Sequence, residues 1–179
     1  EGGVCEGLPI TVEPYSLTEA ETWTHPGIYS HSPIRADGDD GLAHRAIGEF
    51  WQGTGTPGNP YLLHDYIIDG TDKGNCIYIG NTTAHFKISD CTLDSASGMD
   101  WSDWHMDTGI FLNSASNGTL QNNIVNANMI GMFSSSSRSI LAEGNEFSGN
   151  AYGMIVSVCT DMLLRGNNIT DSTDCGLMV

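Results

Sequence analysis

A glycine followed by an apolar residue recurs at almost constant spacing through the second half of the chain. Gly109, Gly131, Gly153 and Gly176 are separated by 22, 22 and 23 residues, and each precedes an isoleucine, methionine or leucine. A fixed period of about 20 to 25 residues is typical of a solenoid. The second half is therefore expected to be a stack of near-identical turns.

The composition of each repeat favours short strands. Asparagine stands 14 residues after each of the first three glycines, at Asn123, Asn145 and Asn167. The segments are too short and too rich in glycine and asparagine for helical hairpins, and they contain no leucine-rich pattern. The remaining possibility is short strands whose side chains alternate between inside and outside. The sequence therefore predicts an all-β parallel β-helix of about 22 residues per turn. A rise of about 4.8 Å per turn would stack the three asparagines into a structural ladder.

The patterning divides the chain into three segments. Residues 1–33 hold four of the six prolines and are interpreted as an extended lead-in. Residues 34–60 are expected to form an N-terminal cap with a short helix, and residues 61–179 are expected to form the β-helix repeats. Because the last residue falls inside the opening strand of a turn, further turns or domains are expected downstream.

The helix of the cap segment is expected to be amphipathic. Asp39 or Asp40 is the expected N-cap, since aspartate accepts hydrogen bonds from free backbone N–H groups there. The apolar residues that are spaced for one helical face are Leu42, Ala43, Ala46, Ile47 and Phe50.

Charge and composition exclude several functions. The chain has 22 acidic and 6 basic residues and a net charge of −16, which argues against binding to nucleic acid or to an anionic lipid surface. No run of 18 apolar residues exists, so the visible chain is not expected to span a membrane. The five cysteines show no C-x-x-C pair and are expected to be mostly buried thiols. Asn-x-Thr triplets at Asn81, Asn117 and Asn168 favour an extracellular location.

Several motifs resemble a known family. They are Ser32-Pro33-Ile34-Arg35, Gly53-Thr54-Gly55-Thr56, Asn59-Pro60-Tyr61, Ile68-Asp69-Gly70 and Ile77-Tyr78-Ile79-Gly80-Asn81-Thr82-Thr83. Over about residues 31–179 the chain resembles secreted archaeal right-handed parallel β-helix repeat proteins of the wider NosD-like and pectate-lyase-like group. The resemblance implies a right-handed coil at the cell surface or outside the cell. Its members include surface proteins, polysaccharide-active enzymes and the copper-pathway accessory protein NosD, so the fold does not decide the function.

An insertion between two repeats is the main candidate site. Leu93 and Gly109 are separated by 16 residues where the equivalent positions of the next repeat are separated by 6, so about ten extra residues form a loop. Trp101 and Trp104 could stack on sugar rings, while Asp100 and Asp103 could bind sugar hydroxyls. The alternative is that the tryptophans cover the coil and the aspartates keep the loop soluble.

The same loop holds the candidates for catalysis. Asp100, Asp103 and Asp107 could act as general acid and base on a glycan, with His105 as an alternative base. The Gly-His-Gly and Arg-Ile-Lys motifs of pectin hydrolases are missing. A copper site at His105-Met106 is a weaker alternative, since the other histidines are scattered.

Calcium is the main candidate cofactor, although the sequence assigns none with certainty. Oxygen ligands could come from the three loop aspartates or, more weakly, from Asp37, Asp39 and Asp40, which form half of a calcium loop with no glutamate at the twelfth position. The latter three are better explained as turn and capping residues.

The sequence thus predicts an extracellular or cell-surface β-helix domain, structural and carbohydrate-binding, without evident catalysis. Its partner would be a polysaccharide or a cell-surface glycan. The first alternative is a polysaccharide lyase or glycoside hydrolase that uses loop carboxylates, and the second is a NosD-like accessory protein.

Overall fold

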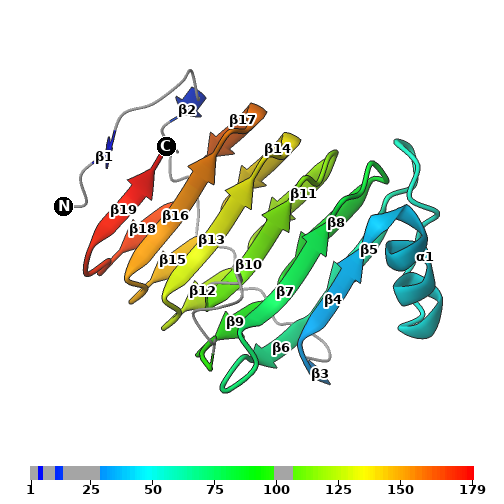
Figure 1. The fold of residues 1–179 in the computed structure, drawn as a ribbon, viewed down its shortest axis with the longest axis horizontal. Helices are drawn as coiled ribbons and strands as arrows, with labels where there is room; N and C mark the ends of the chain where they lie inside the picture. Colours follow the sequence, from blue (N-terminus) through cyan, green and yellow to red (C-terminus); the bar gives the residue numbers. More distant parts are fainter. Residues whose placement is uncertain (1–3, 6–10, 14–28, 99–106) are drawn as a thin grey trace, which may run out of the picture.

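The chain is a coil of short strands. The computed structural model describes residues 4–5, 11–13, 29–98 and 107–179. Successive turns each contribute a strand to three sheets, and all named strand pairs are parallel. Figure 1 shows these strands side by side along the long axis, with the helix at one end. This arrangement is a parallel β-helix, as the 22-residue period predicts.

The first sheet has seven strands. Its order from the far edge to the capped end is β1 (Val4–Cys5), β19 (Cys175–Met178), β16 (Tyr152–Ser157), β13 (Ile130–Ser135), β10 (Thr108–Asn113), β7 (Asn75–Gly80) and β4 (Ile34–Asp37).

The second and third sheets have six strands each. The second is β2 (Thr11–Glu13), β17 (Thr160–Arg165), β14 (Arg138–Glu143), β11 (Gly118–Gln121), β8 (Phe86–Ser89) and β5 (Tyr61–His64). The third is β18 (Asn168–Thr170), β15 (Glu146–Ser148), β12 (Ile124–Asn126), β9 (Thr92–Asp94), β6 (Tyr66–Asp69) and β3 (Tyr29–Ser30).

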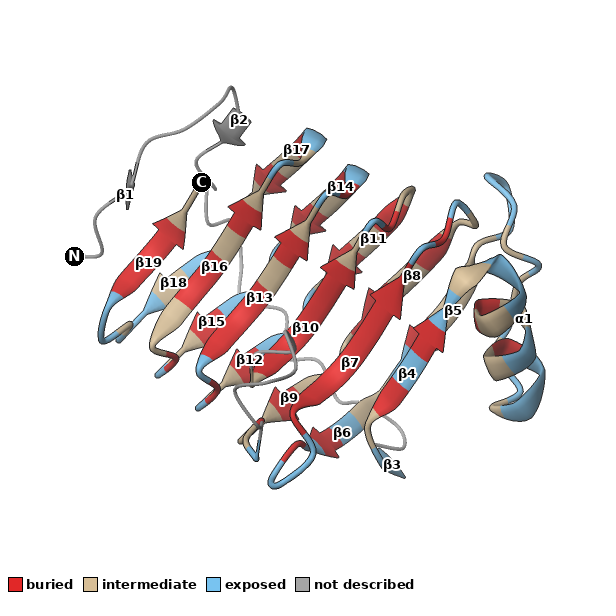
Figure 2. Cartoon of the chain, viewed as in Figure 1, coloured by how far each residue is buried: buried red, intermediate tan, exposed pale blue. Residues whose placement is uncertain are grey.

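Side chains of equivalent phase stack into inward rows. Ile110 pairs with Met132 in the first sheet, and Val125 pairs with Phe147 in the third. All four are buried, as are most of their counterparts in the other turns, while Ile169 in β18 is half-buried. Figure 2 shows buried positions in the strands of successive turns. Each turn alone would expose its apolar row, so neighbouring turns bury one another's core.

The repeated glycines lie where the interior of the coil has no space for a side chain. A Cβ on Gly131 would lie 2.5 Å from the Gly153 carbonyl oxygen and 2.8 Å from Cδ1 of Phe147. A Cβ on Gly109 would lie 2.3 Å from Cγ1 of Val125. The glycine therefore lets the first sheet lie close to the large inward residue of the third sheet.

Tight corners separate the three sheets. The residue that opens a corner commonly has a positive φ, as at Asn122 (55°), Ala127 (52°) and Ser136 (51°). The next residue lies inside the coil and bonds to the adjacent turn. The left-handed conformation at the first position turns the chain sharply enough for the second side chain to reach the interior.

The corner between the second and third sheets holds the asparagine ladder. Nδ2 of Asn123 donates to Oδ1 of Asn145 at 2.9 Å, and Nδ2 of Asn145 donates to Oδ1 of Asn167 at 2.9 Å. Backbone N–H groups of Asn123 and Asn145 donate to the same two oxygens at 3.0 Å. Cys91 continues the ladder toward the capped end, because its backbone N–H donates to Oδ1 of Asn123 at 3.1 Å.

A second ladder, which the sequence analysis missed, lies at the next corner. Nδ2 of Asn128 donates to Oδ1 of Asn150 at 3.2 Å, and the Ala96 N–H donates to Oδ1 of Asn128 at 2.9 Å. Asn128 and Asn150 are also 22 residues apart, so the period contained this signal.

The helix α1 (Gly38–Gly48) connects β4 to the loop before β5 and lies at the end of the coil. Its N-cap is Asp37, so the expectation of Asp39 or Asp40 was wrong. The helix starts earlier because it follows β4 directly, and Asp39 lies inside its first turn. The expected apolar face is also divided: Leu42 and Ala46 are buried, whereas Ile47 is 74% exposed.

The ends of the described chain extend the same sheets. β4 pairs with β7 and β3 pairs with β6, so strands of the coil occur inside both N-terminal segments that the sequence separated. β1 and β2 pair with β19 and β17 at the opposite edge. The domain boundaries at residues 33 and 60 stay a prediction. Among the described residues, no helix is long and apolar enough to cross a membrane.

Replacing Gly131 by alanine should destabilise the coil. The new Cβ would overlap backbone and a buried aromatic ring, and overpacking of this kind costs about 1 to 3 kcal/mol. Gly58→Ala is the matched control, because a Cβ there has no atom within 4 Å. Urea denaturation should show a lower midpoint for Gly131→Ala alone, and equal midpoints would contradict the packing argument.

Removing the middle amide of the ladder should also destabilise the coil. Asn145→Ala leaves the buried N–H groups of Asn123 and the Leu120 carbonyl without their partner. Each unsatisfied buried group costs about 1 to 3 kcal/mol, so we expect a loss of at least about 2 kcal/mol in the free energy of unfolding. Asn126→Ala, on the outward side of the third sheet, should change it by less than about 0.5 kcal/mol. A loss of similar size in both variants would argue against a special role for the ladder.

Candidate functional site

The predicted loop site falls mostly outside the described residues. Asp100, Trp101, Asp103, Trp104 and His105 belong to residues 99–106, which the structure does not describe. Asp107 is described, half-buried just before β10. The roles assigned to this loop in sugar, calcium or proton binding therefore stay predictions.

The three weaker calcium candidates lie at the start of α1, and Asp39 has a structural task there. Its carboxylate accepts hydrogen bonds from Thr82 Oγ1 at 2.6 Å, from the Thr83 N–H at 2.7 Å and from the Ala84 N–H at 3.1 Å. The Thr82 hydroxyl in first place, and then the backbone N–H of Thr83, lower the pKa of Asp39 from 3.8 to about 2. Asp39 thus fastens α1 to the corner after β7.

Asp37 and Asp40 do not join Asp39 in a ligand cluster. Oδ1 of Asp37 accepts a hydrogen bond from Nδ2 of Asn81 at 2.8 Å, and Asp40 is exposed. Within the described part of the chain, no group of three or more histidine, cysteine, aspartate or glutamate side chains is arranged to hold a metal ion.

The Asp39 contacts predict a pH dependence. A pKa lowered in the folded state stabilises the protein above the unfolded-state value near 3.8, and this contribution is lost as pH falls toward about 2. Asp39→Asn should reduce the free energy of unfolding at pH 7 by about 1 kcal/mol or less, since the exposed carboxylate is screened by solvent. It should also flatten the loss of stability between these two pH values.

Urea denaturation at several pH values would measure this effect. Asp40→Asn is the matched control, because Asp40 is the exposed neighbour of Asp39 and contributes no side-chain bond to the Thr82–Ala84 corner. An unchanged pH profile in Asp39→Asn would contradict the assignment.

The described residues form a different site at the capped end. A cleft of about 370 Å³ opens between the end of α1 and strands β3, β5 and β6. It combines aromatic rings, two histidines and two carboxylates. The lining residues are Tyr29, His31, Glu49, Phe50, Trp51, Gln52, Leu62, His64, Asp65 and Tyr66.

One side of the cleft carries a His31–Glu49 pair. Nε2 of His31 lies 3.0 Å from Oε2 of Glu49, and Nδ1 of His31 lies 2.5 Å from the Ser32 carbonyl oxygen. A carbonyl and an ionised carboxylate only accept, so both contacts form together when both ring nitrogens carry protons. Arg45 holds the other Glu49 oxygen at 3.3 Å, which fixes the carboxylate at the end of α1.

The lining also contains a second pair, His64–Asp65. Nδ1 of His64 lies 2.6 Å from Oδ2 of Asp65, and the His64 side chain is 43% exposed. Asp65 has a positive φ of 61° at the corner after β5. The sharp corner of the first complete turn thus brings this carboxylate beside the histidine that precedes it.

Aromatic contacts form the floor of the cleft. Nε1 of Trp51 donates to the Tyr66 hydroxyl at 2.9 Å, and the ring centroids of His31 and Tyr66 are 4.7 Å apart. Burial raises the pKa of Tyr66 above its ordinary value of 10.0, and the Glu49 charge adds to this. The phenol therefore stays protonated at neutral pH and can donate a hydrogen bond.

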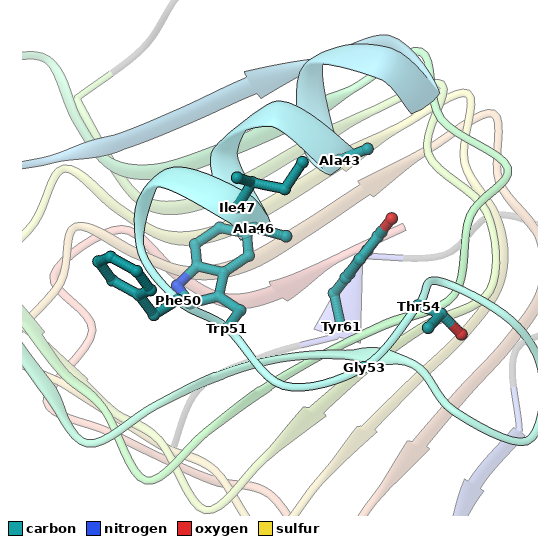
Figure 3. Close-up of a pocket in the computed structure, with 8 residues that line it drawn as sticks. All are labelled: Ala43, Ala46, Ile47, Phe50, Trp51, Gly53, Thr54 and Tyr61. Carbon is teal, nitrogen blue, oxygen red and sulfur yellow. The ribbon is translucent and has the colours of Figure 1, made fainter.

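A second hollow adjoins the cleft on the helix side. It has a volume of about 460 Å³ and is shown in Figure 3, where Phe50 and Trp51 lie below the helix and Tyr61 stands across from them. Phe50 and Trp51 line both hollows. We call this second hollow the helix groove; its other lining residues are Ala43, Ala46, Ile47, Gly53, Thr54 and Tyr61.

The sequence analysis did not find this cleft. Its residues come from β3, the end of α1, β5 and β6, and none of them repeats with the 22-residue period. A weak signal was present in Phe50-Trp51-Gln52, where two aromatic residues directly follow the helix. The predicted apolar face of the helix includes Phe50, and the sequence assigned no role to Trp51 or Gln52.

The asparagine ladders and the buried cysteines contain reactive or polar groups, but their roles are structural. The asparagine ladders lie inside the coil and face the core. Burial raises the pKa of the Cys76 and Cys91 thiols to about 12, so they remain protonated and act as small core residues. Cys76, Cys91, Cys159 and Cys175 are free cysteines.

Comparison with known families agrees with the geometry. The family described as right handed beta helix region matches residues 75–179, which is more than half of the chain. The chain belongs to the right-handed β-helix family. No curated protein and no solved structure matches it. Family membership thus establishes a right-handed parallel β-helix, and the family description names no ligand or activity.

Proposed function

We propose that this β-helix domain is an extracellular or cell-surface module that is structural and binds carbohydrate, with the glycan held in the cleft at the capped end. The observation that carries the proposal is the meeting of aromatic rings and paired polar groups around one open hollow. Tyr29 is 67% exposed and Phe50 is 92% exposed, while two histidine–carboxylate pairs line the same space.

This combination suits a sugar ring. A pyranose has apolar C–H faces that pack on aromatic rings and a rim of hydroxyls that both donate and accept hydrogen bonds. The Tyr66 phenol and the imidazoles can donate, and the carboxylates of Glu49 and Asp65 can accept. The rigid strands and the helix end hold these groups without a ligand, which reduces the ordering cost of binding.

The exposure of Tyr29 and Phe50 at the capped end also supports binding to a partner. Scattered exposed apolar residues are ordinary, but here several gather at one end of the coil beside polar groups. A purely structural solenoid gains no stability from exposing a tyrosine and a phenylalanine at its cap. Binding to an external partner accounts for their position.

A polysaccharide lyase or hydrolase is the second candidate. It is favoured by one observation, that His31–Glu49 and His64–Asp65 face the same cleft and could serve as general acid and base. Assays for reducing ends and unsaturated products on a polysaccharide panel, with calcium and with chelator, would show turnover if this candidate is right. Binding without products would leave the non-catalytic proposal.

Glycan binding should depend on the cleft. We expect the wild-type protein to bind at least one glycan on an array, and Tyr29→Ala to weaken that binding by about tenfold, since one exposed aromatic contact is worth about 1 kcal/mol or more. Ile124→Ala removes a residue that is 42% exposed on the outer face of the third sheet and serves as the control.

The loop must be tested in parallel. Trp101→Ala with Trp104→Ala would abolish binding, and Tyr29→Ala would not, if the glycan lies on the loop. Running the array with calcium and with chelator would detect a calcium-dependent site. Absence of binding to every glycan in both conditions would contradict the carbohydrate proposal.

A further inference from the structure

Phe50 has an unusual conformation. It follows the C-cap residue Glu49 and has a φ of 56°, a left-handed conformation that glycine normally occupies at this position of a helix end. A side chain there is strained. The ring is 92% exposed, so packing inside the chain does not compensate for the strain.

Among the described non-glycine residues with a positive φ, Phe50 is the one aromatic residue, and an exposed ring held in a strained conformation is a candidate for contact outside the chain. Phe50 and its neighbour Trp51 line both the cleft and the helix groove. A ligand that contacted Phe50 could therefore extend from one hollow into the other. In Figure 3 the Phe50 and Trp51 rings lie next to each other below α1, on the side of the groove opposite Tyr61.

The charged residues around the two hollows restrict the charge that a ligand can carry. None of the described residues that line them is lysine or arginine. The cleft has two carboxylates, Glu49 and Asp65, the helix groove has no ionisable group other than Tyr61, and the whole chain has a net charge of −16. A glycan with carboxylate or sulfate groups would be repelled by the cleft carboxylates and would find no lysine or arginine in the lining of either hollow.

We infer that the ligand is a glycan chain without acidic groups that crosses Phe50 from the cleft into the helix groove. This inference rests on the proposed carbohydrate function and adds the charge and the extent of the ligand. One part of the chain would hydrogen-bond to the histidine–carboxylate pairs. The next part would pack its apolar faces on Phe50, Trp51 and Tyr61.

Two sets of ligands test the inference. The first compares soluble neutral polymers (mixed-linkage β-glucan and galactomannan) with polygalacturonate by affinity electrophoresis. The second uses oligosaccharides of increasing length from the neutral polymer that binds, titrated by calorimetry. We expect a neutral polymer to bind, polygalacturonate not to bind, and affinity to rise with length until both hollows are filled.

The key variant is Phe50→Gly. Glycine adopts the positive φ without strain, so this variant should raise Tm. It should also weaken binding of the long oligosaccharide by about tenfold, to the level of a short one, while binding of the short one stays unchanged. Ile124→Ala should alter neither affinity.

The outcomes distinguish failure of the inferred ligand charge and extent from failure of carbohydrate binding itself. Tighter binding of polygalacturonate than of every neutral polymer would overturn the inference and leave carbohydrate binding standing. Equal affinity of Phe50→Gly and wild type for every length would overturn the crossing of Phe50. Failure of all polymers to bind would contradict the proposed function itself, and with it the inference.

Discussion

Every other feature of this molecule depends on the stacking of parallel backbones at a period of 22 residues. The pairing in all three sheets places equivalent residues of successive turns directly above one another. An inward apolar residue therefore becomes a continuous row, and an inward amide becomes a hydrogen-bonded ladder. Parallel β-structure has few local contacts, so the interior must be satisfied along the whole stack. Glycine is required where one sheet lies against a large side chain of another.

The ladders show how a narrow coil can turn sharply. At the corners the chain directs backbone N–H and C=O groups to the interior, where Asn123 and Asn145 are buried. The amides of Asn123 and Asn145 satisfy these groups in two neighbouring turns at once. Ser137 and Cys159 do the same at the corner after the first sheet, where the Ala115 N–H donates to Ser137 Oγ and the Ser137 N–H donates to Cys159 Sγ. Small polar inward residues thus hold the shape that the large apolar rows fill.

The candidate site lies where this regularity ends. Repeated turns present similar residues at similar spacing, so they offer few places where unlike side chains meet. The connection between β4 and β5 is different, because it inserts α1 and the loop after it. There the helix end supplies Glu49 and Phe50, and the loop supplies Trp51. The segment after β3 supplies His31, and β5 supplies His64. Asp39 fastens the helix to the coil, which keeps these groups in a fixed relation.

The sequence by itself determined the coil. The glycine spacing predicted the period, and the asparagines at constant phase predicted the ladder of Asn123, Asn145 and Asn167. These are periodic signals, which repeat because each turn meets the same neighbours. The tertiary structure alone decided the ends and the cleft. The N-cap moved to Asp37 because β4 runs directly into the helix, and Ile47 and Phe50 became exposed because only Leu42 and Ala46 face the coil. The cleft unites residues from β3, α1, β5 and β6, and nothing in their spacing along the chain records that the coil brings them together.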